Sequence, residues 1–302
     1  MHTQRRSELL LASVIIARSS SYLCSKTALG SVTPFTLLSL RFSLAFVLLL
    51  VLFWKRLVGI SMKTVLRGAL LGASFFAMLT AEMFALRTTQ SSTAALLENM
   101  AIVFVPVFSA VIYKKRMTKD TAAGALIAFL GAVLVILRNG RPELGGGVPL
   151  CILAAVLYAV SILLTSRESQ KDDPLTLGIL QVGFMALFSN AAALASGTYT
   201  IPHSPGVWGC ILILAVVCSC FGYTLQPVAQ KGTTPERAGL FCALNPAVAA
   251  VLGWAIRGEN LGALGVLGAA VILCGILASN YLSRHSGPRI RRSGGARLSS
   301  AH

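Results

Sequence analysis

The sequence predicts an all-α membrane protein with ten transmembrane helices, arranged as two inverted five-helix repeats. Hydrophobic residues make up 55% of the 302 residues and charged residues only 12%, whereas charged residues are about 25% of an average soluble domain. Apolar runs long enough to cross a bilayer recur along the chain, separated by short polar breaks. The same plan of runs, breaks and glycines also occurs twice.

The duplication is clearest in residues 238–275. This stretch holds an apolar run with an Asn-Pro pair, a short polar break, and a second apolar run with two glycines one heptad apart. The stretch 144 positions earlier has the same order of run, break and run. Its glycines, Gly124 and Gly131, take the places of Gly268 and Gly275. Self-similarity at a fixed offset indicates a repeated structural unit.

Five apolar runs are expected to form helices in each half. In the first half they cover residues 9–29, 34–54, 65–86, 92–113 and 121–137. In the second half they cover residues 148–166, 174–196, 206–229, 237–256 and 261–282. The expected domains are a first repeat at 8–138, a linker at 139–147, a second repeat at 148–283 and a basic, disordered tail at 284–302.

Basic residues set the expected orientation in the cell membrane. With a cytoplasmic N-terminus, 19 of the 26 lysine and arginine residues fall on the cytoplasmic side and three lie within spans. The outer side holds only Arg87, Arg138, Arg141 and Arg257. The positive-inside rule therefore predicts a multi-pass protein with both termini in the cytoplasm. Because each half has an odd number of spans, the halves are expected to be inverted, as in many secondary transporters.

The net charge of +16 does not indicate a nucleic-acid partner, because most basic residues lie at the ends of apolar runs or in the tail. The seven cysteines lie in apolar runs without a CxxC pair or neighbouring histidines, so we expect buried apolar side chains and no metal site. No cofactor is expected. The expected partners are the lipid bilayer and a small-molecule substrate, and the sequence leaves the oligomeric state open.

Three segments carry a family resemblance. They are residues 34–42 (PFTLLSLRF), residues 85–97 (ALRTTQSSTAALL), and the pair Asn245-Pro246 followed by Gly258-Glu259. With these segments in this order, residues 9–282 resemble the EamA-type transporters of the drug/metabolite transporter superfamily. The resemblance implies a secondary transporter.

Two places depart from the pattern of that family. Arg18 stands about where the family commonly has Trp-Gly in its first span, and residues 114–117 (KKRM) replace the usual Gly-Glu-Arg-Leu. Since the first span of the family usually faces the cavity, Arg18 puts a familiar substrate specificity in doubt.

Five ionisable side chains fall within the predicted spans: Arg18, Lys26, Arg41, Glu82 and Glu98. Each costs roughly 2.5 to 3.5 kcal/mol to insert, so each is a functional candidate. In one interpretation Lys26 or Arg41 snorkels to the outer surface or pairs with Glu82 or Glu98. In the other, one carboxylate titrates during transport while a cation holds an anionic substrate group. Glu98 is then favoured, because its span is the repeat partner of the Asn-Pro span, and protons are the coupling ion.

Polar uncharged residues complete the candidates for the substrate pathway: Tyr158, Gln181, Asn190, Tyr223, Gln226 and Asn245. Asn245 is singled out because the proline after it removes a backbone donor and can free a carbonyl toward a cavity. A simple kink is the alternative. The two tyrosines would contact substrate or only pack. No histidine lies in a span, which excludes a histidine relay.

These patterns favour a secondary transporter, an exporter or carrier of a small metabolite such as an amino acid, that works by alternating access between the two repeats. The chain has no GxxxxGK[ST] pattern for ATP hydrolysis, and no HExxH or GxSxG pattern for an intramembrane enzyme. We therefore expect no enzymatic activity and name no catalytic residue. A lipid or lipid-linked sugar flippase of the same fold, with a cavity that opens sideways, is the alternative.

Reporter fusions test the predicted orientation. A reporter that is active only in the cytoplasm should be active when fused after residue 302, because the basic residues retain that end inside. The same reporter inserted in the linker at 139–147 should be inactive. A reporter that works only outside the cytoplasmic membrane, if active at the C-terminus, would refute the orientation.

Overall fold

A computed structural model describes residues 2–112, 146–233, 244–258 and 262–285, together with a few residues between 123 and 134 and at 235 and 238. These residues form helices joined by turns and short connections, and no strand occurs among them. Most of the predicted span at 121–137, most of the linker and nearly all of the tail lie outside the described residues.

The first repeat begins with three long helices: α1 (His2–Ala28), α2 (Pro34–Leu57) and α3 (Met62–Thr88). Each covers a predicted span, and local sequence explains where α2 and α3 begin. The Thr33 side chain accepts a hydrogen bond from the backbone N–H of Thr36, with a proline at the first helical position. The Ser61 side chain caps α3 in the same way. Such caps satisfy backbone donors that a helix leaves free at its start.

The fourth predicted span is interrupted. The sequence predicted one run at 92–113, but α4 (Ser91–Glu98) ends directly after a glutamate and α5 (Ala101–Ile112) begins three residues later. Asn99 within the break is a weaker helix former than its apolar neighbours. The backbone N–H groups of Met100 and Val103 reach carbonyls only three residues back, which tightens the chain there.

The second repeat contains α7 (Val148–Glu168), α8 (Pro174–Ala195), α12 (Leu244–Arg257) and α13 (Gly262–His285). Between α8 and α12, the predicted span at 206–229 is built from α9 (Pro205–Ile213), the π-helix η2 (Leu214–Tyr223) and α10 (Thr224–Lys231). The π-helix was not predicted from the sequence.

Among the residues that the structure describes, six helical segments are long and apolar enough to cross a membrane. They correspond to α2, α3, α4 with α5, α7, α8, and α9 through α10. The described residues therefore form an all-helical, multi-pass membrane protein. The total of ten spans remains a prediction.

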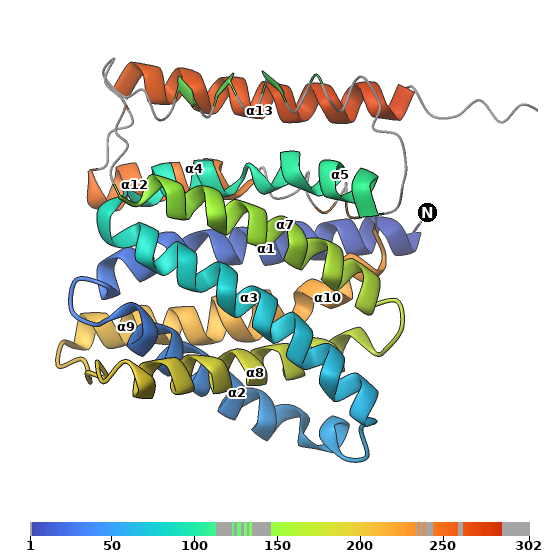
Figure 1. Cartoon of the computed structure of the whole chain (residues 1–302), viewed down its shortest axis with the longest axis vertical. Coiled ribbons are helices and arrows are strands. Elements are labelled where there is room, and N and C mark those ends of the chain that lie inside the picture. Colours follow the sequence, from blue (N-terminus) through green and yellow to red (C-terminus); the bar gives the residue numbers. More distant parts are fainter. Residues whose placement is uncertain are drawn as a thin grey trace, which may run out of the picture.

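Contacts between the repeats come in pairs related by the duplication. α2 packs on α8, its counterpart in the second repeat. The third span of the first repeat, α3, packs on the first span of the second, α7, and the first span, α1, packs on the third span of the second repeat at η2 and α10. In the same way α1 packs on α12, the fourth span of the second repeat, and α7 packs on α4 and α5, the fourth span of the first. Figure 1 shows α1 running through the middle of this bundle, so residues of α1 can contact several helices of the second repeat.

Two glycines let α3 approach α8 closely. A Cβ on Gly68 would lie 2.5 Å from the Cβ of Leu180, and one on Gly72 would lie 2.6 Å from the Cβ of Phe184. Gly68 and Gly72 are four residues apart and therefore share one face of α3. Small residues at this spacing are typical of close helix contacts in membranes.

Candidate functional site

A polar face of α1 points into the centre of the bundle. Arg18, Ser21, Tyr22 and Ser25 follow helical spacing and are all buried. In a membrane such a face is stable only if helices from the rest of the chain supply polar partners.

Arg18 receives its partners from the second repeat. Its Nη1 donates to the hydroxyl of Tyr158 at 3.0 Å and to Oε1 of Gln226 at 2.7 Å. Its Nη2 donates to the hydroxyl of Tyr223 at 2.9 Å. The guanidinium carbon also lies 4.1 Å from the centre of the Tyr223 ring, within cation–π range. Three predicted candidates, Arg18, Tyr158 and Tyr223, thus form one cluster.

The π-helix η2 shapes the space that Arg18 occupies. A Cβ added to Gly222 of η2 would lie 2.7 Å from Cγ of Arg18, which is closer than atoms tolerate. Glycine therefore lets the arginine stem pass against the helix. π-Helical turns are frequent at functional sites, and this one carries Ser219 and Tyr223, which contact the two buried arginines.

Arg41 of α2 is fully buried, with 0% of its surface exposed. Its Nε donates to the hydroxyl of Ser219 at 2.8 Å, and its Nη1 donates to the hydroxyl of Ser21 at 3.2 Å. Among the described residues, no carboxylate oxygen lies within 4.0 Å of this guanidinium. The direct pairing of Arg41 with Glu82 or Glu98 that the sequence suggested is therefore not formed in this structure.

Glu82 and Glu98 are both buried, at 4% and 2% exposure. Their carboxyl groups share a hydrogen bond, and Glu98 also bonds to Tyr22. Two carboxyl groups can share a hydrogen bond only if one of them carries a proton. Glu98 is the last residue of α4, so this pair lies at the break in the fourth span.

Lys26 holds the end of α3. Its Nζ donates to the backbone oxygens of Leu86 at 2.5 Å and Thr89 at 2.8 Å. A cation at the C-terminus of a helix satisfies carbonyls that have no helical partner and opposes the helix dipole. Lys26 therefore has a structural contact at one end of the bundle.

Asn245 and Gln181 differ in their surroundings. Asn245 of α12 accepts a hydrogen bond from the hydroxyl of Ser19 at 2.6 Å, which joins the Asn-Pro segment to α1. Gln181 of α8 is fully buried, and neither atom of its side-chain amide has a hydrogen-bond partner among the described residues. Gln181 is thus a buried polar group without a contact to the Arg18 cluster.

The site also contains residues outside the predicted candidates: Tyr22, Asn99 and Ser219. Tyr22 lies four residues after Arg18, so helical spacing alone could have placed it on the same face. Of the other predicted polar candidates, Gln226 contacts Arg18, whereas Asn190 bonds to Ser39 and Ser43 of α2. Ser219 depends on the turn of η2, and Asn99 on the break after Glu98. The sequence carried no signal for either of these two features.

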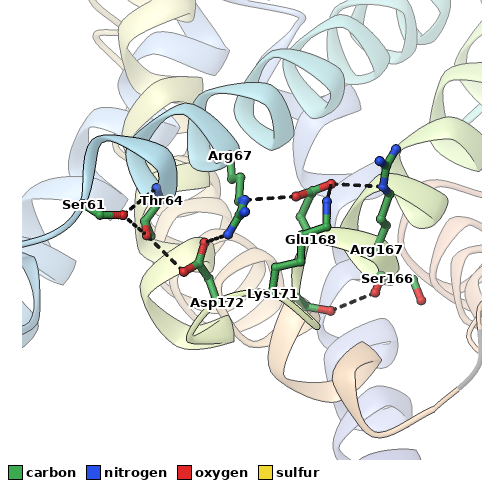
Figure 2. Close-up of polar contacts among 9 residues, drawn as sticks. Ser61, Thr64, Arg67, Ser166, Arg167, Glu168, Lys171 and Asp172 are labelled. Atoms are coloured by element: carbon green, nitrogen blue, oxygen red, sulfur yellow. Dashed lines mark hydrogen bonds and ion pairs between the residues drawn. The ribbon is translucent and has the colours of Figure 1, made fainter.

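A second polar cluster joins the halves at the predicted cytoplasmic side (Figure 2). Nε of Arg67 on α3 lies 3.3 Å from Oε2 of Glu168, and Arg67 also pairs with Asp172. The Thr64 hydroxyl donates to Asp172 at 3.1 Å, and Nζ of Lys171 lies 2.7 Å from Oε1 of Glu168. Glu168 and Asp172 belong to the end of α7 and the turn before α8, so the cluster connects first-repeat to second-repeat elements.

A more exposed ion pair lies beside this cluster. Nη1 of Arg56 is 3.3 Å from Oδ2 of Asp173, and both side chains are about half exposed. Although partial burial opposes its ionisation, hydrogen bonds from Thr176 and the charge of Arg56 lower the pKa of Asp173. The turn before α8 is therefore held by charges on the first repeat.

Comparison with known proteins identifies the family. A model of the EamA-like transporter family matches residues 5–137 and, a second time, residues 145–281. The chain belongs to the EamA-like transporter family. The two matches fit a duplicated architecture, and the family makes this protein a membrane transporter.

Two relatives of this EamA-like transporter have names that state no substrate. One from Archaeoglobus fulgidus, named an uncharacterized transporter, is 27% identical over 90% of this chain and 96% of its own length. The uncharacterized transporter YcxC of Bacillus subtilis is 28% identical over 86% of this chain and 88% of its own length. A solved crystal structure of another protein is 19% identical and superposes with a TM-score of 0.70 over 94% of this chain and 99% of that one. That likeness concerns the fold alone.

The EamA-like bundle also has an apolar groove between α3 and α7, with a volume of about 590 Å³. It is lined by Phe76, Ala77, Thr80, Ala81, Phe84, Leu150, Leu153 and Leu157. None of the charged residues of the site lines it, so the groove is separate from the Arg18 cluster.

The fit of Arg18 against Gly222 generates a mutational prediction. Gly222→Ala should displace the arginine stem and disturb its three hydrogen bonds, lowering the transport rate about tenfold or more, since misplacement of about 1 Å can cost 10²-fold. Transport by purified protein in liposomes is the measurement. Gly209→Ala is the matched control, because a Cβ at Gly209 meets nothing within 4 Å. Equal transport by the two variants would show that this contact does not position Arg18.

Proposed function

We propose that the protein is a secondary transporter, an exporter or carrier of a small metabolite such as an amino acid, that works by alternating access between two inverted repeats. The polar centre supports this most strongly. Charged groups of α1 and α2 meet hydroxyl and amide groups of α7, η2 and α10 there. A buried polar site between repeats is where secondary transporters bind substrate.

Access to this centre is closed by contacts between the repeats at both ends. At one end, the Thr36 hydroxyl donates to the backbone oxygen of Thr198 at 3.1 Å. At the other end lies the ion cluster around Arg67 (Figure 2). Substrate can reach the centre only if one of these sets of contacts opens, and release on the far side needs the other to open. This is the physical requirement of alternating access.

The cytoplasmic cluster should control one of these openings. Arg67→Gln removes both ion pairs that join α3 to the second repeat, while Glu168 keeps its pair with Lys171, so the cytoplasmic side should open more often. Ser169 lies between Glu168 and Asp172 in the sequence and is fully buried. A cysteine introduced there by Ser169→Cys can therefore report the opening. We expect its labelling by a membrane-impermeant maleimide, applied from the cytoplasmic side, to be faster in the Arg67→Gln background.

Lys63→Gln is the matched control for that labelling experiment. Lys63 is an exposed neighbour of Arg67 on α3 and has no ion pair among the described residues. Equal labelling rates in the Arg67→Gln and Lys63→Gln backgrounds would show that the cluster does not close the cytoplasmic side.

Glu82 and Glu98 supply a proton-binding pair for coupling. The groups that face Glu98 are Glu82, Tyr22 and Arg18, and Glu82 also interacts electrostatically with Arg41. Two adjacent buried carboxyls resist being ionised together, so an altered environment in another conformation would release or bind a proton. Transport would then depend on the proton gradient.

Transport assays on Glu98→Gln test both the function and the coupling. Wild-type protein in liposomes should accumulate components of a radiolabelled amino-acid mixture when a pH gradient is imposed, and empty liposomes should not. Glu98→Gln should keep the hydrogen bonds to Glu82 and Tyr22, because the amide preserves the shape, yet lose the dependence on the gradient. Thermal stability in detergent should stay close to the wild-type value.

The surface variant Asp173→Asn serves as the control and should still respond to the gradient. Wild-type transport that ignores the gradient would rule out coupling by this pair. A stability loss that Arg41→Gln reverses in the double mutant would instead favour a structural role of Glu98 as a counter-charge. Absence of any amino-acid transport would refute the amino-acid assignment.

The groove between α3 and α7 favours a second candidate, a flippase for a lipid or lipid-linked sugar. Its apolar lining fits an acyl chain, and it opens at the contact between the two repeats. Movement of a fluorescent phospholipid between leaflets, in liposomes in which amino acids are not transported, would favour this candidate.

A further inference from the structure

The second guanidinium of the site, that of Arg41, has unused donor capacity. Arginine stays charged in proteins and presents five N–H donors. Two serine hydroxyls take up Nε and Nη1, but Nη2 is buried and has no hydrogen-bond partner among the described residues. A buried charged donor left in this state is costly unless a further group binds it in some step of the protein's cycle.

No carboxylate contacts Arg41 directly. Arg18 and Arg41 bring two positive charges to the centre of the bundle, and among the described residues no carboxylate oxygen lies within 4.0 Å of the Arg41 guanidinium. Rings stabilise Arg41 only partly, with Phe42 at 5.0 Å and Tyr223 at 5.5 Å from its guanidinium carbon. An anion bound at Nη2 would give Arg41 the direct counter-charge that it lacks.

The Arg41 guanidinium and the aromatic rings beside it indicate which anion fits. A guanidinium is planar, and its fork of N–H groups matches a carboxylate. Beside it, the Tyr223 ring meets the ring of Phe42 edge to face at 5.9 Å and that of Phe75 at 5.4 Å. These rings give an apolar wall next to a cationic donor, which suits a small molecule with a carboxylate attached to an apolar or aromatic group.

We propose that the transported substrate is a small monocarboxylate and that Nη2 of Arg41 binds its carboxylate. This inference rests on the proposed transport function and narrows it, because it requires the carboxylate and leaves an amino group optional. Arg41 is then a binding residue of α2, whereas Ser219 and Ser21 orient its guanidinium.

Two matched pairs of probes test the proposal on the whole protein in detergent. Benzoate and phenylalanine carry a carboxylate, and benzamide and phenylalaninamide are their amides without it. We expect both carboxylates to raise the melting temperature with increasing concentration, and both amides to leave it unchanged. An equal response to acid and amide, or no response to either acid, would overturn the proposal.

Variants of Arg41 separate binding from structure. Arg41→Gln removes a buried charge that has no direct ion pair among the described residues, so its melting temperature without ligand should equal or exceed that of the wild type. It should no longer respond to benzoate. Arg41→Lys keeps the charge but loses the planar fork, so its apparent affinity should fall about tenfold. Arg87→Gln, at an exposed arginine, should keep the full response. Destabilisation of Arg41→Gln together with an unchanged benzoate response would show that Arg41 is structural.

Failure of the carboxylate site can be distinguished from failure of the proposed transport function. Carboxylate-dependent stabilisation without transport in liposomes would uphold the binding site and refute the transporter of small metabolites. Transport of phenylalaninamide as fast as phenylalanine would uphold a transporter and refute the carboxylate site.

Discussion

The rest of the structure depends on how buried guanidinium groups are accommodated in a membrane. Each ionisable group in a span costs roughly 2.5 to 3.5 kcal/mol, and α1 to α4 carry four of them at the centre. Arg18 is stable there because Tyr158, Tyr223 and Gln226 of the second repeat accept its hydrogen bonds. The first repeat alone does not supply these acceptors. The polar centre therefore ties the folding of one half to the presence of the other.

The chemistry that closes the two ends of the centre is different. Charged groups around Arg67 hold the predicted cytoplasmic end, whereas hydroxyls and backbone oxygens near Thr36 hold the opposite end. Salt screens exposed charges but acts little on neutral hydrogen bonds. The helix pairs that join the repeats thus correspond to one another by symmetry, but the side chains that make the contacts at the two ends do not. Such asymmetry allows one end to respond to conditions that leave the other unchanged.

Much of this arrangement could be predicted from the sequence, for physical reasons that differ between features. The lengths of the apolar runs predicted the spans of α2, α3, α7 and α8, because the thickness of a bilayer fixes the length of a spanning helix. The cost of burying charge selected Arg18, Arg41, Glu82 and Glu98, and all four are buried in one centre. The π-helix and the break after Glu98 could not be predicted, because both depend on backbone hydrogen bonds that follow from packing. The hydrogen bond from Arg41 to Ser219 could not be predicted either, because the turn of η2 places Ser219.

The contact between Gly222 and the stem of Arg18 has a consequence for how such proteins diverge. Position 222 tolerates no side chain as long as position 18 holds a long one that passes beside it, at 2.7 Å from where a Cβ would stand. A shorter residue at 18 removes that restriction and also leaves Tyr158 and Tyr223 without their shared donor. We therefore expect the two positions, which are 204 residues apart in the chain, to be substituted together in homologues. A homologue that has lost the arginine has changed its polar centre as a unit, and with it the range of molecules that the centre can accept.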